Sequence, residues 1–382
     1  MRTESMHSPR EQARALAGRA VAGSVAERDR EARWDRALFR RLGEEGLLGA
    51  VLPREFGGGG RPAAELVEAM IGFGEGSGDA GLALAWAAHT LGCALPIARL
   101  GSAAQRRRHL PGLASGERVG SWAHAERPIA GDPVGVQARA IRTADGWLLA
   151  GRKIAVVHAA HADLFVVSAV TEPSQGRRGI STFLVERSAP GLFVAPGRAT
   201  AGARTAAIGE LVLDRCPVPE DSLLGSAGEG LRLTWRLVQR WERACGPAAW
   251  LGLSRAALAR ATDQARGQVR FGAPLAGSQV VRGRLADLKI RVELGERLLA
   301  RAARLLDADA PDAERELVSA RLFLADSVAV IARELAGLAG PPAAEPEPAI
   351  ERLARDAPFA GLLGVEVDVL RSILAGAVLG LG

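Results

Sequence analysis

The sequence predicts a mostly helical protein with a β-domain in the middle of the chain. Apolar residues recur with a helical period up to about residue 115 and again from about residue 226. Between them they form short runs separated by turn residues. A chain of 382 residues, 48% of them hydrophobic, is long enough for more than one folding unit. We therefore expect three domains, covering residues 1–115, 116–225 and 226–382.

The first of these stretches is typical of amphipathic helices. Trp34, Leu38 and Leu42 fall on one helical face, with charged residues between them. The most apolar run, Gly81 to Ala98, contains a histidine, a threonine and a proline, which favours a buried helix over a membrane span. The first residues are polar and carry no apolar signal-peptide core, so we expect a cytoplasmic location and no membrane insertion.

The middle stretch has the pattern of short strands joined by turns. Leu164 to Val167 and Thr182 to Val185 are apolar runs, and the turn signal Pro173 to Gly176 lies between them. A further run, Leu211 to Leu213, precedes two prolines. This part of the chain is therefore expected to form the β-domain.

The last stretch returns to helices and carries more apolar surface than one bundle needs. One apolar face is formed by Leu285, Leu288, Val292, Leu299, Ala302 and Leu306. A second lies near the C-terminus, at Leu370, Ile373, Leu374 and Val378. Gly340 to Pro348 contains four prolines, which excludes a helix and favours an extended loop. We expect the long face and the apolar tail to build a dimer or tetramer.

The charge of the chain favours an enzyme with an anionic ligand over a nucleic-acid binder. The formal net charge is +6, but the basic residues are dispersed among acidic ones apart from Arg106 to Arg108. The three cysteines lie far apart in the sequence, so neither a metal site nor a disulfide framework is expected.

Several short phrases identify a resemblance that covers nearly the whole chain. They occur in a fixed order: Leu110 to Glu117, Gly151 to Lys153, Val218–Pro219, Phe271–Gly272 and Arg355 to Ala357. Together they resemble the acyl-CoA dehydrogenase family. The resemblance implies an N-terminal helical domain, a β-barrel-like middle domain and a C-terminal four-helix bundle. It also implies FAD as cofactor and α,β-dehydrogenation of an acyl thioester of CoA or of an acyl-carrier protein. In this chemistry a carboxylate takes the α-proton while the β-hydrogen leaves as hydride.

The family places its catalytic carboxylate in one of two positions. In many members it lies in a loop after the Arg-Asp-Ala phrase, where this chain has Gly364, with Glu366 two residues later. Other members place it on a helix of the bundle. Counting back from the Phe-Gly phrase brings that position to Glu242, which is followed by Arg243 as in the family pattern. The resemblance implies Glu242 as base and Glu366 as runner-up. The alternative is that Glu242 is an ion-paired residue of an arginine-rich helix.

The expected flavin site departs from the family pattern. Ala125 and Val157 stand where the family has hydroxyl side chains. Gln268 stands where the family has an arginine that reaches the FAD of another subunit. The proline-rich segment Gly340 to Pro348 replaces a glycine turn of the family. Trp122 could stack on the flavin ring, and His124, His158 and His161 are new polar groups around the expected flavin edge. The candidate cofactor-binding residues are Trp122, His124, Ala125, Val157, Gln268, Phe271 and Gln279. The lost contacts predict that FAD binds weakly or not at all.

Three functions are compatible with these features. The first is an FAD-dependent dehydrogenase of acyl thioesters. The second is a family member without redox activity, either a partner subunit or a non-oxidative enzyme acting on a tethered acyl group. The third is a flavin monooxygenase or oxidase of the same fold. Fold alone does not decide between them.

Overall fold

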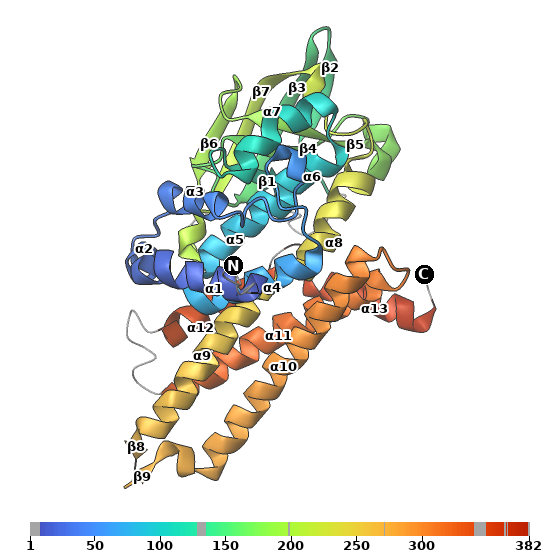
Figure 1. The fold of residues 1–382 in the computed structure, drawn as a ribbon. Coiled ribbons are helices and arrows are strands. Elements are labelled where there is room, and N and C mark those ends of the chain that lie inside the picture. The colour runs from blue at the N-terminus through green and yellow to red at the C-terminus, as the bar shows by residue number, and fades with distance from the viewer. Residues whose placement is uncertain are drawn as a thin grey trace, which may run out of the picture.

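The computed structural model describes residues 8–127, 135–197, 199–270, 272–339, 349–362, 364 and 366–380. Helices occupy both ends of the chain and a seven-stranded sheet lies between them, which confirms the predicted architecture (Figure 1). Phe271 and the proline-rich segment 340–348 fall outside the described residues.

The N-terminal part is helical, as predicted. Its helices are α1 (Pro9–Ala20), α2 (Val25–Arg30), α3 (Arg36–Glu44), α4 (Ala63–Ser77), α5 (Ala80–His89), α6 (Leu95–Leu100) and α7 (Ala103–Ala114). Local signals begin several of them: Ser8 and Ser102 form capping boxes, and Asp79 accepts from the Leu82 amide at 2.9 Å. The stretch Ala80–Leu100 is long and apolar enough to cross a membrane, but 94% of its most apolar window is buried inside the protein, as expected for a core helix.

The middle part forms one sheet. Its strands are β1 (Gly120–Ala123), β2 (Arg139–Thr143), β3 (Gly146–Val156), β4 (Leu164–Val170), β5 (Ile180–Glu186), β6 (Leu192–Pro196) and β7 (Gly209–Pro219). The order is β1-β4-β2-β3-β7-β6, and β5 pairs with β4 in register from Leu164↔Glu186 to Val170↔Ile180. Strand β4 runs parallel to β1 and β2, whereas the other pairs are antiparallel. The apolar runs predicted as strands are buried in β4 and β5.

The C-terminal part is a helical bundle with one small hairpin. Its helices are α8 (Arg236–Cys245), α9 (Ala248–Gly267), α10 (Gln279–Asp307), α11 (Ala313–Ala339), α12 (Ala349–Leu362) and α13 (Val367–Leu379). The sequence predicted helices only, but Val269–Arg270 (β8) pairs with Ala273–Pro274 (β9). Gly272 has a φ of +79° and Pro274 lacks an amide hydrogen, so the helix cannot continue through this turn.

The long apolar face of α10 is used inside the chain. Leu288, Val292 and Leu299 are at most 2% exposed, and α10 packs against α11. The expectation that this face joins two copies is therefore wrong, because its own bundle already covers it. Exposed apolar side chains of the bundle helices lie elsewhere: Val280, Ile290 and Leu294 on α10, and Val369, Ile373, Val378 and Leu379 on α13.

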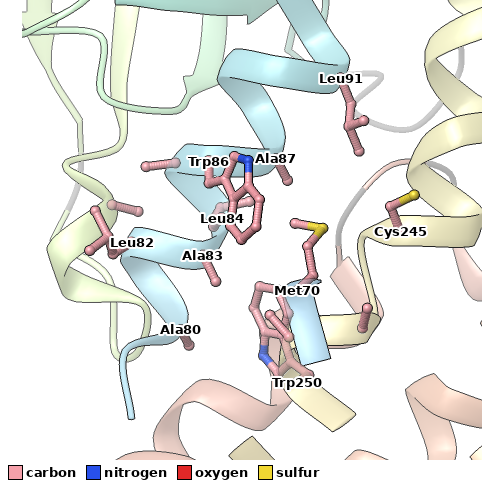
Figure 2. Close-up of a cluster of buried hydrophobic side chains, with 14 of the residues drawn as sticks. Met70, Ala80, Leu82, Ala83, Leu84, Trp86, Ala87, Leu91, Cys245 and Trp250 are labelled. Atoms are coloured by element: carbon pink, nitrogen blue, oxygen red, sulfur yellow. The ribbon is translucent and has the colours of Figure 1, made fainter. Parts of the chain in front are cut away.

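A shared core holds α8 against the N-terminal helices. Figure 2 shows Trp86 of α5 and Met70 of α4 beside Trp250 of α9 and Cys245 of α8. All four side chains are at most 1% exposed. This packing fixes the position of α8, which runs from the β-domain towards the bundle (Figure 1).

Candidate active site

Glu242 presents a shielded carboxylate on α8. Both of its carboxylate oxygens are buried and have no hydrogen-bond partner in the described part of the chain. Burial raises the pKa of Glu242, and the positive charges of Arg321 and Arg243 oppose that shift. The group is therefore a stronger proton acceptor than an exposed carboxylate when it is ionised.

The arginines that flank Glu242 in the sequence pair with other acids. Arg240 lies 2.9 Å from Asp309, and Arg243 donates to Glu314. Because both arginines have other partners, the structure does not support the alternative that Glu242 is an ordinary ion-paired residue of this helix. The buried cation that acts most strongly on Glu242 is Arg321 of α11, which donates to the carbonyl of Ala360.

Glycine at position 364 leaves room for this carboxylate. A Cβ built on Gly364 would overlap Glu242 Oε2 and would lie 3.1 Å from Gln239 Oε1. The structure thus brings the two positions together as expected from the resemblance, with the small residue in the loop and the carboxylate on the helix. The runner-up, Glu366, is exposed at the N-terminus of α13, where its carbonyl accepts from the Leu370 amide.

Gln239 was missed at the sequence level. It lies one helical turn before Glu242, is 5% exposed, and its Oε1 atom has no partner among the described residues. The available signal was its spacing of three residues from the candidate base, which places both side chains on one side of a helix.

Trp122 and His124 lie together at the end of β1. Their rings are stacked, with centroids 5.5 Å apart and planes at 7°. His124 Nδ1 lies 2.9 Å from Ser168 Oγ, while Nε2 is buried without a partner in the described residues. Burial lowers the pKa of His124 to about 3, with a smaller effect from Lys153, so the ring is neutral at physiological pH.

The main chain brings the other expected flavin positions beside this strand. The Ala125 carbonyl accepts from the Ile154 amide at 2.9 Å, and the Val157 carbonyl accepts from Ser121 Oγ at 2.8 Å. Residues 125 and 157 therefore both lie beside the segment that carries Trp122 and His124. Neither side chain offers a hydroxyl there.

A buried ion pair anchors the segment that carries His124. Lys153 Nζ lies 2.5 Å from Glu126 Oε1 and donates to the His124 carbonyl at 3.2 Å. Glu126 also accepts from the amides of Gln137 and Ala138. Burial lowers the pKa of Lys153 to about 8, and Glu126 opposes this shift. The network fixes the backbone next to the Trp122–His124 pair.

The structure separates the other two histidines from this pair. His158 Nε2 lies 2.8 Å from the Gly120 carbonyl, and its ring packs against Trp34 and Phe39. His161 stacks on Trp34 with ring centroids 4.6 Å apart. His158 and His161 therefore contact the N-terminal helices, whereas His124 lies beside Trp122.

Gln268 and Gln279 lie at the far end of the bundle. Gln268 follows α9, with its amide bonded to the Gln264 carbonyl, and Gln279 is exposed at the start of α10. The β8–β9 hairpin between them lies at the end of the long helices remote from the β-domain (Figure 1). One chain therefore does not bring these residues to Trp122 and His124.

A basic cleft follows the exposed side of α8 and the helical segment Gly230–Trp235 directly before it. It has a volume of about 570 Å³ and is lined by Arg99, Leu100, Arg232, Leu233, Arg236, Leu237, Arg240, Trp241, Leu306, Asp307 and Asp309. Three of its arginines follow one another at helical spacing, and Arg99 and Arg236 form no ion pair in the ranges that the structure describes. The cleft suits an anionic group. Within the same ranges, no cluster of three histidine, cysteine or acidic side chains could hold a metal.

Comparison with known families gives three matches along the chain. The models for the acyl-CoA dehydrogenase N-terminal, middle and C-terminal domains match residues 3–117, 122–216 and 228–379. One curated relative, the L-prolyl-[peptidyl-carrier protein] dehydrogenase of Pseudomonas fluorescens, is 41% identical over 270 residues, which cover 70% of this chain and 71% of that protein.

Solved structures extend the likeness over nearly the full length. PigA with FAD and proline has a TM-score of 0.94 at 25% identity and covers 98% of this chain and 97% of its own. The prolyl acyl carrier protein oxidase AnaB has a TM-score of 0.93 at 27% identity, with 97% of each chain covered.

Proposed function

Because the chain belongs to the acyl-CoA dehydrogenase family, we propose that it uses FAD to dehydrogenate an acyl thioester between its α- and β-carbons, with Glu242 as the base. One observation carries the assignment of the base: both Glu242 oxygens are buried without partners next to Gly364. A structural carboxylate in such a place would normally be hydrogen-bonded. A base must keep its oxygens available for a substrate proton.

The reaction asks two things of Glu242. It must be ionised when the substrate binds, and it must hold the proton afterwards. Arg321 and Arg243 favour the ionised form, whereas burial raises the pKa and favours capture of the proton. The proton of the α-carbon moves to a Glu242 oxygen, the α–β double bond forms, and the β-hydrogen leaves with its electron pair. FAD, when bound, supplies the acceptor for that hydride.

The residues at the end of β1 fit a flavin. The Trp122–His124 stack offers a flat surface, and the buried Nε2 of His124 offers one hydrogen bond whose direction depends on the tautomer. The Lys153–Glu126 pair holds this strand in place. We assign Trp122, His124 and the main chain around Ala125 and Val157 to the flavin site. These contacts support an oxidative function over the non-redox alternatives.

We propose a prolyl or related aminoacyl thioester on a carrier protein as the substrate. The names of three similar proteins support this choice, since two act on prolyl carrier proteins and a third was solved with FAD and proline. The basic cleft along α8 suits the phosphate of a pantetheine arm, which carrier proteins and CoA share. This cleft runs along the helix that carries Glu242.

A homo-oligomer and a cytoplasmic location belong to the same proposal. Gln268 and Gln279 lie far from the β-domain of their own chain, so they would contribute to a flavin site only through another copy. The exposed apolar side chains of α13 offer a surface for such an assembly.

The test is reduction of the bound flavin by substrate without oxygen. Purified holoenzyme is mixed with a prolyl-loaded carrier protein, with prolyl-CoA and with butyryl-CoA. The prolyl carrier should bleach the flavin absorbance fastest and lose two hydrogens by mass spectrometry. Reduction by butyryl-CoA alone would refute the carrier assignment. If no thioester reduced the flavin or lost hydrogens, the non-redox alternative would replace this proposal.

A further inference from the structure

Gln239 and Glu242 converge on one point in the active site. A Cβ on Gly364 would overlap Glu242 Oε2 and would lie 3.1 Å from Gln239 Oε1, so both side chains flank the same small space. Gln239 is 5% exposed. Three shielded oxygens, two from Glu242 and one from Gln239, have no donor in the part of the chain that the structure describes.

This arrangement lacks hydrogen-bond donors. Buried amide oxygens are nearly always satisfied in folded proteins, and an unsatisfied one destabilises the fold. A simple acyl chain cannot supply the missing donor, because its α- and β-carbons carry only C–H bonds. An aminoacyl group can, because its nitrogen is attached to the same carbon that loses its proton to Glu242.

Building on the function proposed above, we infer that Gln239 accepts a hydrogen bond from the α-nitrogen of the substrate and selects aminoacyl thioesters over simple acyl thioesters. Either form of the substrate nitrogen carries an N–H donor that Gln239 Oε1 could accept. A neutral prolyl ring has one N–H, which matches the single unpartnered oxygen of Gln239.

A pair of substrates with the same ring size tests the inference. Prolyl-pantetheine and cyclopentanecarbonyl-pantetheine differ by an NH in place of a CH₂. We measure kcat/KM for both substrates with the wild type and with Gln239→Leu. For each protein we take the ratio of kcat/KM for the prolyl substrate to kcat/KM for the cyclopentanecarbonyl substrate. The variant should reduce the preference for the prolyl substrate about tenfold or more, because a site built around a polar group discriminates strongly against its absence. Gln239→Glu keeps an acceptor oxygen and should keep the preference.

The control is Gln264→Leu, which makes the same change at an exposed position of α9. Its ratio should equal that of the wild type. Each ratio compares two substrates on one protein preparation, so partial unfolding of a variant cancels. An equal loss on both substrates in Gln239→Leu would show that Gln239 only positions Glu242, and would overturn the inference.

A binding measurement separates this inference from the proposed reaction. The amide analogues of both pantetheine compounds cannot be turned over easily, and their dissociation constants can be measured by calorimetry on the holoenzyme. If the wild type turned over neither thioester, the proposed function would fail. A prolyl preference in binding that disappears in Gln239→Leu would still support the role of Gln239, and equal binding of both analogues by the wild type would refute it.

Discussion

The carboxylate of Glu242 occupies the space in which a side chain at position 364 would begin. A Cβ on Gly364 would overlap Glu242 Oε2. A side chain at position 364 could therefore not coexist with the Glu242 carboxylate in its present position. The position of the Glu242 carboxylate on α8 therefore depends on glycine at position 364 of the loop. In this arrangement the proposed base lies on α8, and the loop carries no carboxylate at position 364.

Gly364→Ala should displace the base. The new methyl group would push the Glu242 carboxylate from its place, and turnover should fall by about tenfold to a hundredfold, as for a small misplacement of a reacting group. Gly364 has a φ of +70°, so the variant also carries backbone strain of about 1 kcal/mol. Gly46→Ala is the matched control, since Gly46 has a φ of +79° and open space around it. It should lose similar stability in denaturant unfolding and keep its turnover.

Glu242→Gln should remove the base while keeping the fold. The amide has nearly the same shape but does not accept the α-proton, so turnover should fall by roughly two to four orders of magnitude. Circular dichroism and thermal unfolding would check the fold. Glu366→Gln, at an exposed position before α13, should leave turnover unchanged. The opposite pattern would place the base in the loop.

The activity should depend on pH through Glu242. Only the ionised carboxylate accepts a proton, so kcat/KM is lost as the pH falls through the pKa of Glu242 in the free enzyme. Burial raises that pKa, and the inflection should therefore lie above the usual range of a glutamate. The measurement is the kcat/KM profile with a substrate that does not titrate in that range, such as cyclopentanecarbonyl-pantetheine. An inflection at or below the ordinary glutamate value would contradict the assignment.

FAD should bind more weakly than in family members that keep the hydroxyl side chains. Ala125→Thr and Val157→Thr each restore one hydroxyl, and a new hydrogen bond of about 1 kcal/mol would tighten FAD about fivefold. His124→Leu should weaken binding, because it removes the unpartnered Nε2. Titration of the apoprotein with FAD, followed by flavin fluorescence, gives the dissociation constants. A wild-type protein that stays fully yellow after dialysis would contradict the prediction.

The protein should form a dimer or tetramer through surfaces other than the buried face of α10. Ile373 and Val378 on α13 are 42% and 76% exposed, so another copy would bury apolar area there. Light scattering should give two or four times the mass of 39.9 kDa, and Ile373→Asp should shift the equilibrium towards the monomer. A wild type that is monomeric at micromolar concentration would refute this prediction.

The sequence by itself determined the order of helices and strands and the identity of the candidate base. Helical and strand periods follow from backbone geometry within a few residues, so Trp34, Leu38 and Leu42 or the run Leu164 to Val167 could be interpreted locally. The resemblance to the family implied a carboxylate on a bundle helix, and counting back from the Phe-Gly phrase located that position at Glu242. None of these inferences needs two distant parts of the chain to meet.

Only the tertiary structure decided which residues share a site. It placed Gly364 against Glu242 and Gln239, separated His124 from His158 and His161, and buried the α10 face inside its own bundle. Each of these contacts joins segments far apart in the sequence. Their formation depends on the packing of several elements at once, because close-packed side chains must fill a common space and every buried polar group must find a partner. A local pattern of residues does not contain that information.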